Sequence, residues 1–298
     1  MEKLKLIIAM LIVGSIGIFV HYIPISSTLI ATARALIGTI FLFILILLQK
    51  KAINWKKVRE NSLYLLVSGA FIGFNWIFLF EAYQYTSIAI ATLCYYMAPA
   101  FVILLAPFVL KEKISGFNLL CSGFAILGAV LISGVLSGGE SSLLGIGYGL
   151  VAALLYASIM ILNKKTKGLS GLELTFFQLL AAAAVMLPYA LLTEDISSVS
   201  WTSQIIGLLL FVGIVHTGLV YQLFFSAMNK LPTQTSSLLS YIDPITAIFL
   251  SAIILNQTLT LIQVLGTLLI LGSAISNEFF TQKSNARKSL ETISQNIS

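Results

Sequence analysis

Long apolar runs alternate with short polar connections along almost the whole chain. A helix needs about 20 apolar residues to cross the hydrocarbon core of a bilayer. Runs of about that length lie at 6–23, 28–48, 62–80, 88–110, 117–136, 143–162, 174–192, 204–226, 236–255 and 261–280. The pattern therefore predicts an all-α integral membrane protein with ten transmembrane helices. The polar segment 281–298 is predicted to be a disordered tail.

The amino-acid composition fits a lipid environment better than water. Of the 298 residues, 58% are hydrophobic and 9% are charged, and the mean hydropathy is +1.01. Soluble domains carry about 25% charged residues. The net charge of +6 comes from basic residues spread over short connections, so it does not indicate a nucleic-acid partner. Cys94 and Cys121 lie in apolar runs without the spacing of a metal site, and we expect neither a metal nor a cofactor.

The positions of Lys and Arg predict which side of the membrane each connection faces. With a cytoplasmic N-terminus, the cytoplasmic segments contain 16 of the 17 basic residues and the five opposite connections contain none. The remaining one, Arg34, lies within a helix. Basic residues accumulate in the cytoplasmic connections of membrane proteins, so the distribution predicts that both termini are cytoplasmic.

The two halves of the chain resemble each other at one constant offset. A shift of 145 positions aligns Gly73 with Gly218, Phe80 with Phe225, Ala82 with Ala227, Leu93 with Leu238, Tyr96 with Tyr241, Pro99 with Pro244 and Leu110 with Leu255. Each repeat then holds five helices. Because five is odd, the second repeat has the opposite orientation in the membrane to the first. We therefore expect two inverted five-helix repeats, residues 1–137 and 138–280, before the polar cytoplasmic tail 281–298. In many secondary transporters, such repeats place the substrate near the bilayer midplane.

These residues also resemble a known family. The stretch from Ala82 to Gly134 contains Tyr-Thr-Ser-Ile-Ala, then Pro99 within a helix, then Leu-Lys-Glu-Lys-Ile-Ser. It is similar to the repeat of the drug/metabolite transporter superfamily, EamA type. Residues 227–272 resemble its second copy, and Gly14-Ser15 followed by Arg34 resembles the opening of the first. The resemblance implies a ten-helix carrier of a small metabolite in the cytoplasmic membrane. The chain departs from the family at Gln257, where a glutamate is usual.

Ionisable residues deep in a membrane need an explanation, because a central charge costs about 2.5–3.5 kcal/mol on insertion scales. Asp243 lies near the centre of its predicted span, directly before Pro244, which frees a backbone carbonyl. It is predicted to contact a cationic substrate or accept a proton; alternatively, a hydroxyl such as that of Ser240 holds it as a structural acid. His216 is either a proton-relay partner of Asp243 or a neutral packing group.

Arg34 lies in the outer half of the second predicted helix, about 6 Å from its centre. A guanidinium there can bind a substrate carboxylate through two parallel hydrogen bonds. Alternatively, Arg34 forms a structural ion pair with Glu81 at the outer end of the third helix.

Polar and aromatic residues gather on both sides of the predicted midplane. The outer group is Asn75, Trp76, Tyr95 and Tyr96, and the inner group is Gln178, Tyr221, Ser240 and Tyr241. Under the repeat, the pair 95–96 corresponds to 240–241, and position 76 corresponds to 221. An aromatic cage around an ammonium group is one interpretation, and an interfacial aromatic belt is the other. We favour a substrate cavity that includes Trp76, Asn75, Tyr95, Tyr96, Tyr241, Ser240 and Arg34.

The sequence thus predicts a secondary transporter of a small polar metabolite, such as an amino acid or an amine, working by alternating access with possible proton coupling through Asp243 and His216. It has no GxxxxGK[ST] loop for ATP and no HExxH or G-x-S-x-G motif for catalysis, so we do not expect an enzyme. The alternatives are an intramembrane transferase or hydrolase that uses His216 and Asp243, and a subunit that moves no solute. Membrane lipid and protons are further expected partners.

Overall fold

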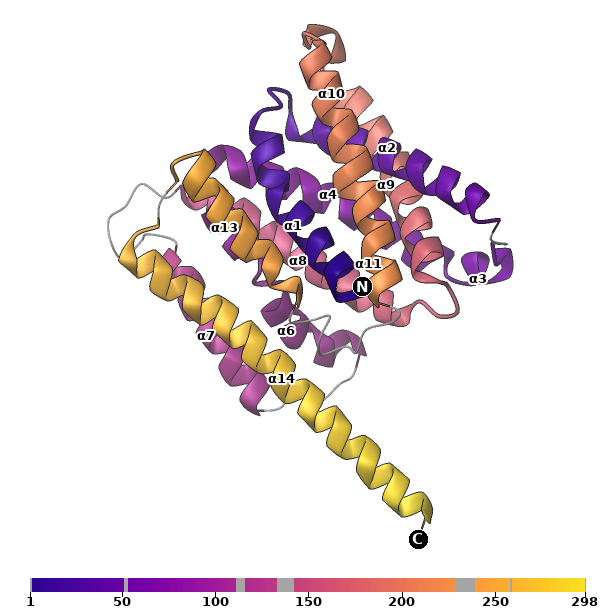
Figure 1. Cartoon of the computed structure of the whole chain (residues 1–298), viewed down its shortest axis with the longest axis vertical. Helices are drawn as coiled ribbons and strands as arrows, with labels where there is room; N and C mark the ends of the chain where they lie inside the picture. The colour runs from indigo at the N-terminus through magenta and orange to yellow at the C-terminus, as the bar shows by residue number, and fades with distance from the viewer. Residues whose placement is uncertain are drawn as a thin grey trace.

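The structure, a computed structural model, describes residues 2–50, 53–110, 116–132, 142–228, 239–257 and 259–297. The described chain is helical and contains no strand in these ranges. Its helices are α1 (Glu2–His21), α2 (Ser27–Leu48), α3 (Trp55–Glu60), α4 (Ser62–Tyr85), α5 (Ile88–Tyr95), α6 (Ala98–Leu110), α7 (Gly116–Ile132), α8 (Leu143–Lys165), α9 (Gly171–Thr193), η1 (Ile196–Ser198), α10 (Ser203–Phe211), η2 (Val212–Leu219), α11 (Val220–Met228), α13 (Ile242–Ile254) and α14 (Leu261–Ile297). Figure 1 shows α7 and α14 side by side at one edge of the bundle, and α13 beside α1.

Helix starts follow from hydroxyl side chains just before the apolar runs. Ser26, Ser87, Ser142, Ser170 and Thr202 each accept a hydrogen bond from a backbone N–H of the first turn. Such caps satisfy donors that have no partner within the helix. At α9 the cap is reciprocal, because the Glu173 carboxylate also accepts from the backbone N–H of Ser170.

The long helices are apolar on their outward surfaces as well as inside. Seven helical stretches are long and apolar enough to cross a membrane: α1, α2, α4, Ile88–Leu105, α8, α9 and Ser203–Phe224. Three shorter apolar helices are Gly116–Leu131, Ile242–Ile254 and Leu261–Asn277. Leu48 is 74% exposed and Leu192 is 86% exposed, as suits side chains that face lipid. The predicted all-α membrane architecture is confirmed, while the number of ten crossings stays a prediction.

Polar residues lie inside the bundle instead. Ser68, Asn75, Gln178 and Thr217 are each at most 3% exposed. Gln178 Nε2 donates to Ser68 Oγ at 2.8 Å and to Asn163 Oδ1 at 2.6 Å, which links α9 to α4 and α8. Buried polar groups without such partners would cost free energy, so these bonds fix how the helices pack.

Two spans predicted as continuous helices are interrupted. The run 88–110 divides into α5 and α6, with a turn at Tyr96 and Met97. In the run 236–255, a turn at Tyr241 precedes α13. The physical reason is the proline three residues after each tyrosine, since proline offers no backbone N–H to the carbonyl four residues earlier.

The predicted span 204–226 is also irregular, and the sequence does not predict how. Between α10 and α11, residues Val212–Leu219 form a π-helix. Short π-helical stretches are rare and often occur at functional sites. This segment packs on α2, where a Cβ added to Gly38 would lie 2.6 Å from a methyl group of Thr217. The close approach brings the backbone of His216 and Thr217 to the side chains of α2.

Two further differences concern polar segments. Helix α14 continues to Ile297, so the predicted disorder of the tail is wrong for residues 281–297. That segment contains neither Gly nor Pro, and its Ala, Leu, Lys and Arg residues favour helix. The short helix α3, which lies in a predicted connection, is capped by the Asn54 side chain, which accepts from the Lys57 N–H at 3.2 Å.

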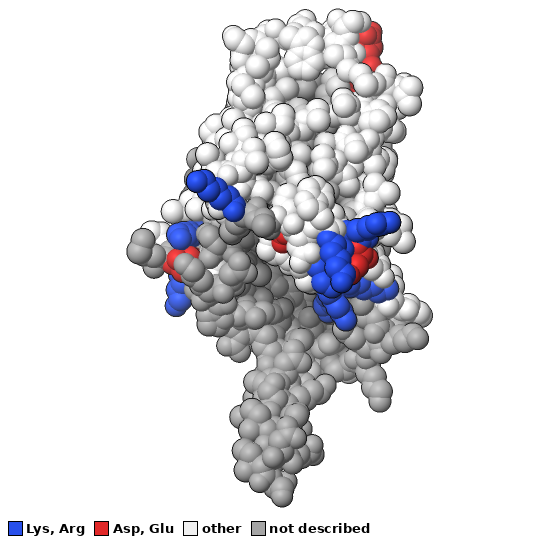
Figure 2. Space-filling view, turned by 90° about the vertical axis from the view of Figure 1, so that its right-hand side faces the viewer, with Lys and Arg blue, Asp and Glu red and all other residues white. Residues whose placement is uncertain are grey.

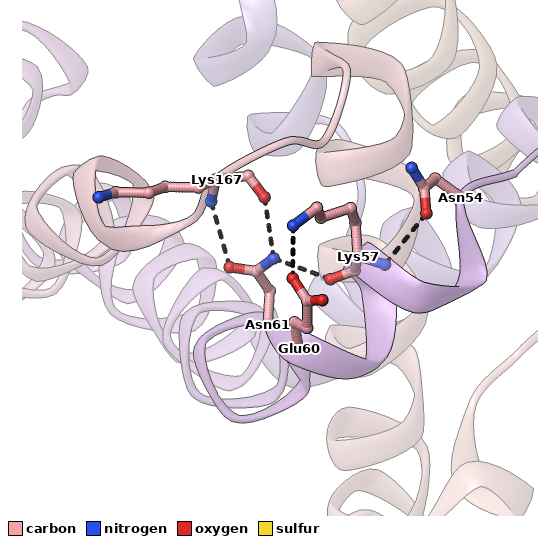
Figure 3. A network of polar contacts seen from close by, with 5 residues as sticks. All are labelled: Asn54, Lys57, Glu60, Asn61 and Lys167. Atoms are coloured by element: carbon pink, nitrogen blue, oxygen red, sulfur yellow. Dashed lines mark hydrogen bonds and ion pairs between the residues drawn. The ribbon is translucent and has the colours of Figure 1, made fainter.

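Helix α3 and the connection after α8 form a polar network (Figure 3). Asn61 Nδ2 donates to the carbonyls of Lys57 and Lys167 at 2.8 and 3.1 Å, and the Lys167 N–H donates to Asn61 Oδ1 at 3.2 Å. The Lys57 ammonium pairs with Glu60 at 2.6 Å. Asn54 extends the network through its N–H, which donates to Glu173 Oε1 at 2.9 Å. The connections before α4 and before α9 therefore lie on the same side of the molecule.

At other connections, segments with no basic residue meet one another. Gln257 Oε1 accepts from the N–H of Ile88 at 3.0 Å, which joins the connection after α13 to the start of α5. Tyr22, Pro24, Ser198 and Gln204 help to line a cavity of about 530 Å³ between the α1–α2 and α9–α10 connections. On the face drawn in Figure 2, Lys and Arg lie in a band across the middle, and the surface above this band is white apart from acidic side chains near its tip.

Candidate functional site

The two helix breaks have nearly the same backbone conformation. Tyr96 has φ −72° and ψ 6°, and Tyr241 has φ −74° and ψ −5°. The two residues occupy corresponding positions of the repeat, and their ring centroids lie 6.4 Å apart. The breaks of the two halves therefore meet in the interior. Broken helices at corresponding positions are where many transporters with inverted repeats bind substrate.

A hydrogen bond joins the two breaks. The Tyr96 hydroxyl donates to Asp243 Oδ2 at 2.6 Å and lies 3.5 Å from the carbonyl oxygen of Ser240. Pro244 cannot donate to that carbonyl, so the tyrosine approaches an oxygen that the helix leaves free. The Asp243 carboxylate thus accepts a hydrogen bond from Tyr96 in the other half of the chain.

Asp243 lies in the first turn of α13, where the N–H groups of a helix favour negative charge. The tyrosines within electrostatic range of its carboxylate include Tyr83, Tyr95, Tyr96 and Tyr156. They come from α4, α5, the α5–α6 turn and α8. From α1, Gly14 contributes backbone alone, and a Cβ added there would lie 2.5 Å from the carbonyl oxygen of Asp243. Among the described residues, no basic group pairs with this acid.

Arg34 occupies a second buried position and is 7% exposed. Its Nε donates to Thr217 Oγ1 at 2.8 Å, and Nη2 lies 3.5 Å from the carbonyl oxygen of His216. Its guanidinium carbon lies 4.0 Å from the centre of the Trp76 ring, a cation–π distance. The π-helix and the aromatic face therefore stabilise the charge, and the ion pair predicted with Glu81 is not found among the described contacts.

His216 does not contact Asp243 in the described part of the chain. Its Nε2 lies 3.0 Å from Ser15 Oγ, and the Ser15 hydroxyl donates to the carbonyl of Ile12 at 2.8 Å. The Ser15 oxygen is therefore left to accept from Nε2–H, while Nδ1 has no hydrogen-bond partner. Because Ser15 follows Gly14, which packs on Asp243, helix α1 lies between the two ionisable groups.

Asn75, Trp76 and Tyr95 connect the two charged positions. Asn75 Nδ2 donates to the carbonyl of Ala152 at 2.5 Å, and the Tyr95 hydroxyl lies 3.4 Å from Asn75 Oδ1. Tyr95 also stacks on Tyr156 with 5.1 Å between ring centroids. A continuous polar and aromatic layer thus runs from Arg34 over Trp76, Asn75 and Tyr95 to the Tyr96–Asp243 pair. That these rings line one substrate cavity stays a prediction.

Sequence reasoning missed three residues of this layer. Tyr156 has no special sequence neighbours and lies in an apolar run. Thr217 is one threonine among many, although it stands directly after His216 in an otherwise apolar run, and such a polar pair could have identified it. Ser15 was noted for the family resemblance but not as a partner of His216.

The arrangement presents a guanidinium and a carboxylate from opposite ends of one buried layer. Guanidinium binds carboxylate groups, and a carboxylate surrounded by tyrosines suits an ammonium group. In the part of the chain that the structure describes, no group of three or more His, Cys, Asp or Glu side chains could hold a metal ion.

The apolar helices and the layer between them define a multi-pass membrane protein with a polar interior. Comparison with known proteins makes the class specific. The sequence model of the EamA-like transporter family matches residues 3–134 and again 143–277. The chain belongs to this family, as its resemblance to EamA-type repeats predicts.

Individual relatives agree with this assignment. The chain is 34% identical over 276 residues to "Uncharacterized transporter YxxF" of Bacillus subtilis (strain 168), covering 90% of this chain and 86% of that protein. It is 26% identical over 263 residues to "Uncharacterized transporter YoaV" of the same organism, covering 87% and 89%. One solved crystal structure superimposes with a TM-score of 0.65 at 17% identity, covering 95% of this chain and 98% of the other, which shows the same fold.

Proposed function

We propose that this protein is a secondary transporter that carries a small polar metabolite across the cytoplasmic membrane by alternating access, coupled to protons. Membership of a transporter family supports the general function. One observation carries the finer proposal: the Tyr96–Asp243 hydrogen bond, which joins the helix breaks of the two repeats. A ligand that competes for Asp243 separates the two halves at that contact, so binding and rearrangement are linked.

The substrate class follows from the two charges. An α-amino acid or a similar zwitterion presents its carboxylate to Arg34 and its ammonium group to Asp243 and the nearby tyrosines. Trp76 already stacks on the guanidinium at 4.0 Å and so orients it. An amine without a carboxylate uses the Asp243 end alone and is expected to bind more weakly.

Proton coupling is assigned to Asp243. A carboxyl group that takes up a proton on one side, and releases it to water when a cationic substrate binds on the other, links the two fluxes. His216 contacts Ser15, and the rings of Phe19 and Phe211 lie 4.9 and 5.5 Å from its ring. We therefore treat His216 as a packing group that supports the π-helix. The absence of a described hydrogen bond between His216 and Asp243 also gives no support to the transferase or hydrolase alternative.

The decisive experiment compares sealed and unsealed preparations. The purified protein is reconstituted in liposomes, and counterflow of labelled zwitterionic amino acids is measured beside amines and carboxylic acids of the same size. The proposal expects zwitterions to be exchanged in sealed vesicles and to raise the melting temperature in detergent more than either single-charge analogue. Chemical conversion of a solute in detergent, with no counterflow, contradicts the proposal.

The orientation proposed here places both termini in the cytoplasm. It rests on the distribution of basic residues and on the contact between the basic connections shown in Figure 3. In a protein without its native cysteines, a cysteine at Ser198 should react with an impermeant reagent added outside intact cells. A cysteine at Lys165 should react after the membrane is opened. The opposite pattern overturns the orientation without affecting the transporter assignment.

A further inference from the structure

A small cavity lies beside Tyr96, near the start of α6. It has a volume of about 10 Å³ and lies between α6, α7 and α14. Its lining includes Tyr96, Cys121, Ser122, Ser273 and Asn277. A cavity of this size has room for about one water molecule, provided that two or more polar groups hold it.

The polar groups around the cavity offer acceptors. The hydroxyl groups of Ser122 and Ser273 donate to carbonyls of their own helices, at 3.0 and 2.9 Å, so their oxygens remain as acceptors. Asn277 Oδ1 is buried and has no hydrogen-bond partner. A buried acceptor of this kind is commonly satisfied by an internal water. The three side chains therefore fit one water that donates its two hydrogens among them.

The α7–α14 interface bounds the cavity at both ends. Toward one end, a Cβ added to Gly128 would lie 2.7 Å from the carbonyl oxygen of Gly266, so the helices touch there. Toward the other end, the rings of Phe117 and Phe280 lie 4.4 Å apart. Phe117 precedes Cys121 by four residues and Phe280 follows Asn277 by three, so both rings lie about one helical turn beyond the cavity. Figure 1 shows these two helices running together at the edge of the bundle.

We propose that this cavity is the cytoplasmic water and proton entry to Asp243, closed toward the cytoplasm by the Phe117–Phe280 pair. That protons need to reach Asp243 rests on the proposed proton coupling. The route that they take is inferred from the cavity, the unpartnered Asn277 oxygen and the Tyr96–Asp243 bond. A protonated water in the cavity gives its proton to the Tyr96 oxygen while the Tyr96 hydroxyl proton passes to Asp243 Oδ2. The water, a neutral tyrosine and a protonated carboxyl group remain.

The native cysteines provide the test. The chain contains two, Cys94 and Cys121. Cys121 lines the cavity, whereas Cys94 is fully buried and packs against Gly149. Cys94→Ala leaves Cys121 as the reporter, and Cys121→Ala leaves Cys94 as the matched control. Inside-out and right-side-out vesicles are treated with Ag⁺, a thiol-reactive cation small enough to follow water. The thiol that remains free is then labelled with a maleimide in denaturant.

Cys121 should react at least about tenfold faster than Cys94, and from the cytoplasmic side. Phe280→Ala should raise the Cys121 rate further, while Phe279→Ala on the neighbouring, 50% exposed position should leave it unchanged. A Cys121 rate equal to that of Cys94 both with and without Phe280→Ala overturns the entry path, as does reaction from outside.

A transport measurement separates this inference from the proposed function. Asn277→Leu keeps the approximate volume and removes the water acceptor, so it should lower both the rate at which Ag⁺ reacts with Cys121 and the pH-dependent part of counterflow. Its melting temperature in detergent establishes that it folds. If Cys121 reacts as expected but no variant changes any transport, the cavity is hydrated and the proposed coupling is wrong. If transport responds to pH and Asn277→Leu does not alter it, the proton enters elsewhere and this inference is wrong.

Discussion

Arg34 and Asp243 both carry a charge into the interior, but their surroundings differ. Arg34 is held from three sides, by Thr217, by the His216 carbonyl and by the Trp76 ring. Within the described part of the chain, the Asp243 carboxylate accepts one hydrogen bond, from Tyr96, and it lies at the start of a helix. A guanidinium has five N–H donors and a carboxylate accepts about four hydrogen bonds. Both groups therefore keep capacity for a ligand, but Arg34 is fixed in orientation while Asp243 depends on one contact between the repeats.

This difference indicates separate tasks. A cation held by a π-helix and an aromatic ring suits recognition, because these contacts orient it before a ligand arrives. An acid held by one hydroxyl from the other repeat suits switching, since exchanging that partner changes how the repeats contact each other. The predictions below test whether recognition and coupling can be separated in this way.

The largest effect is expected from Arg34→Gln. Losing one partner of a desolvated charge pair costs about 2–5 kcal/mol, which corresponds to a loss of affinity of roughly 30-fold or more. Zwitterion binding should fall by this factor, while amines without a carboxylate bind as before. Isothermal titration of both ligand types measures the difference. Arg59→Gln, at an exposed basic residue outside the layer, is the control, and equal losses for both ligand types would contradict the recognition role.

Asp243→Asn should abolish coupling and weaken binding of the ammonium group, while Arg34 still holds the substrate carboxylate. The amide keeps the shape but cannot exchange a proton, so transport becomes independent of pH. A proton exchanged against the substrate supports a substrate gradient of about tenfold for each unit of pH gradient, since one unit is worth 1.36 kcal/mol. That substrate gradient should be lost, and counterflow without a pH gradient should remain. Uptake into liposomes with and without an imposed gradient measures it; an unchanged pH profile would make the acid structural.

The smallest effect is expected from Thr217→Val, which removes the hydroxyl that accepts from Arg34 Nε. A hydrogen bond of this kind contributes about 0.5–1.5 kcal/mol, so zwitterion affinity should fall by roughly 2- to 12-fold. The pH dependence of transport should not change, because Asp243 is untouched. Thr217→Ser, which retains the hydroxyl, should behave like the wild type. A changed pH profile in Thr217→Val would show that recognition and coupling are not separable.

Much of this architecture could be predicted from the sequence. Apolar runs of membrane length indicate the helices directly, and one offset of 145 positions indicates the repeat. Arg34 and Asp243 attract attention because charges are rare in such runs. The pairing of Tyr96 with Asp243 could not be predicted, since it joins residues 147 apart and depends on how two breaks meet.

The helix breaks and the π-helix could not be predicted from the sequence pattern either. Pro99 and Pro244 signal a weakened helix, but they do not say whether the result is a kink or a full break. The π-helix at Val212–Leu219 has no proline at all. Its cause is packing, because Gly38 of α2 allows Thr217 to approach closely. Close contact between distant helices is a tertiary effect that local periodicity does not contain.

The network of Figure 3 has a mechanical consequence. Asn61 and Asn54 in the first half hold the backbone of Lys167 and the side chain of Glu173 in the second half. Each of these bonds joins a side chain to a main-chain atom. The residue that supplies the main-chain atom can therefore vary, while the two halves are still kept from separating at this point. If the halves tilt against each other, this joint is the pivot and the opposite ends travel furthest. The cavity of about 530 Å³ beside Tyr22 and Ser198 lies far from these bonds, so a small rotation about them would widen this cavity most.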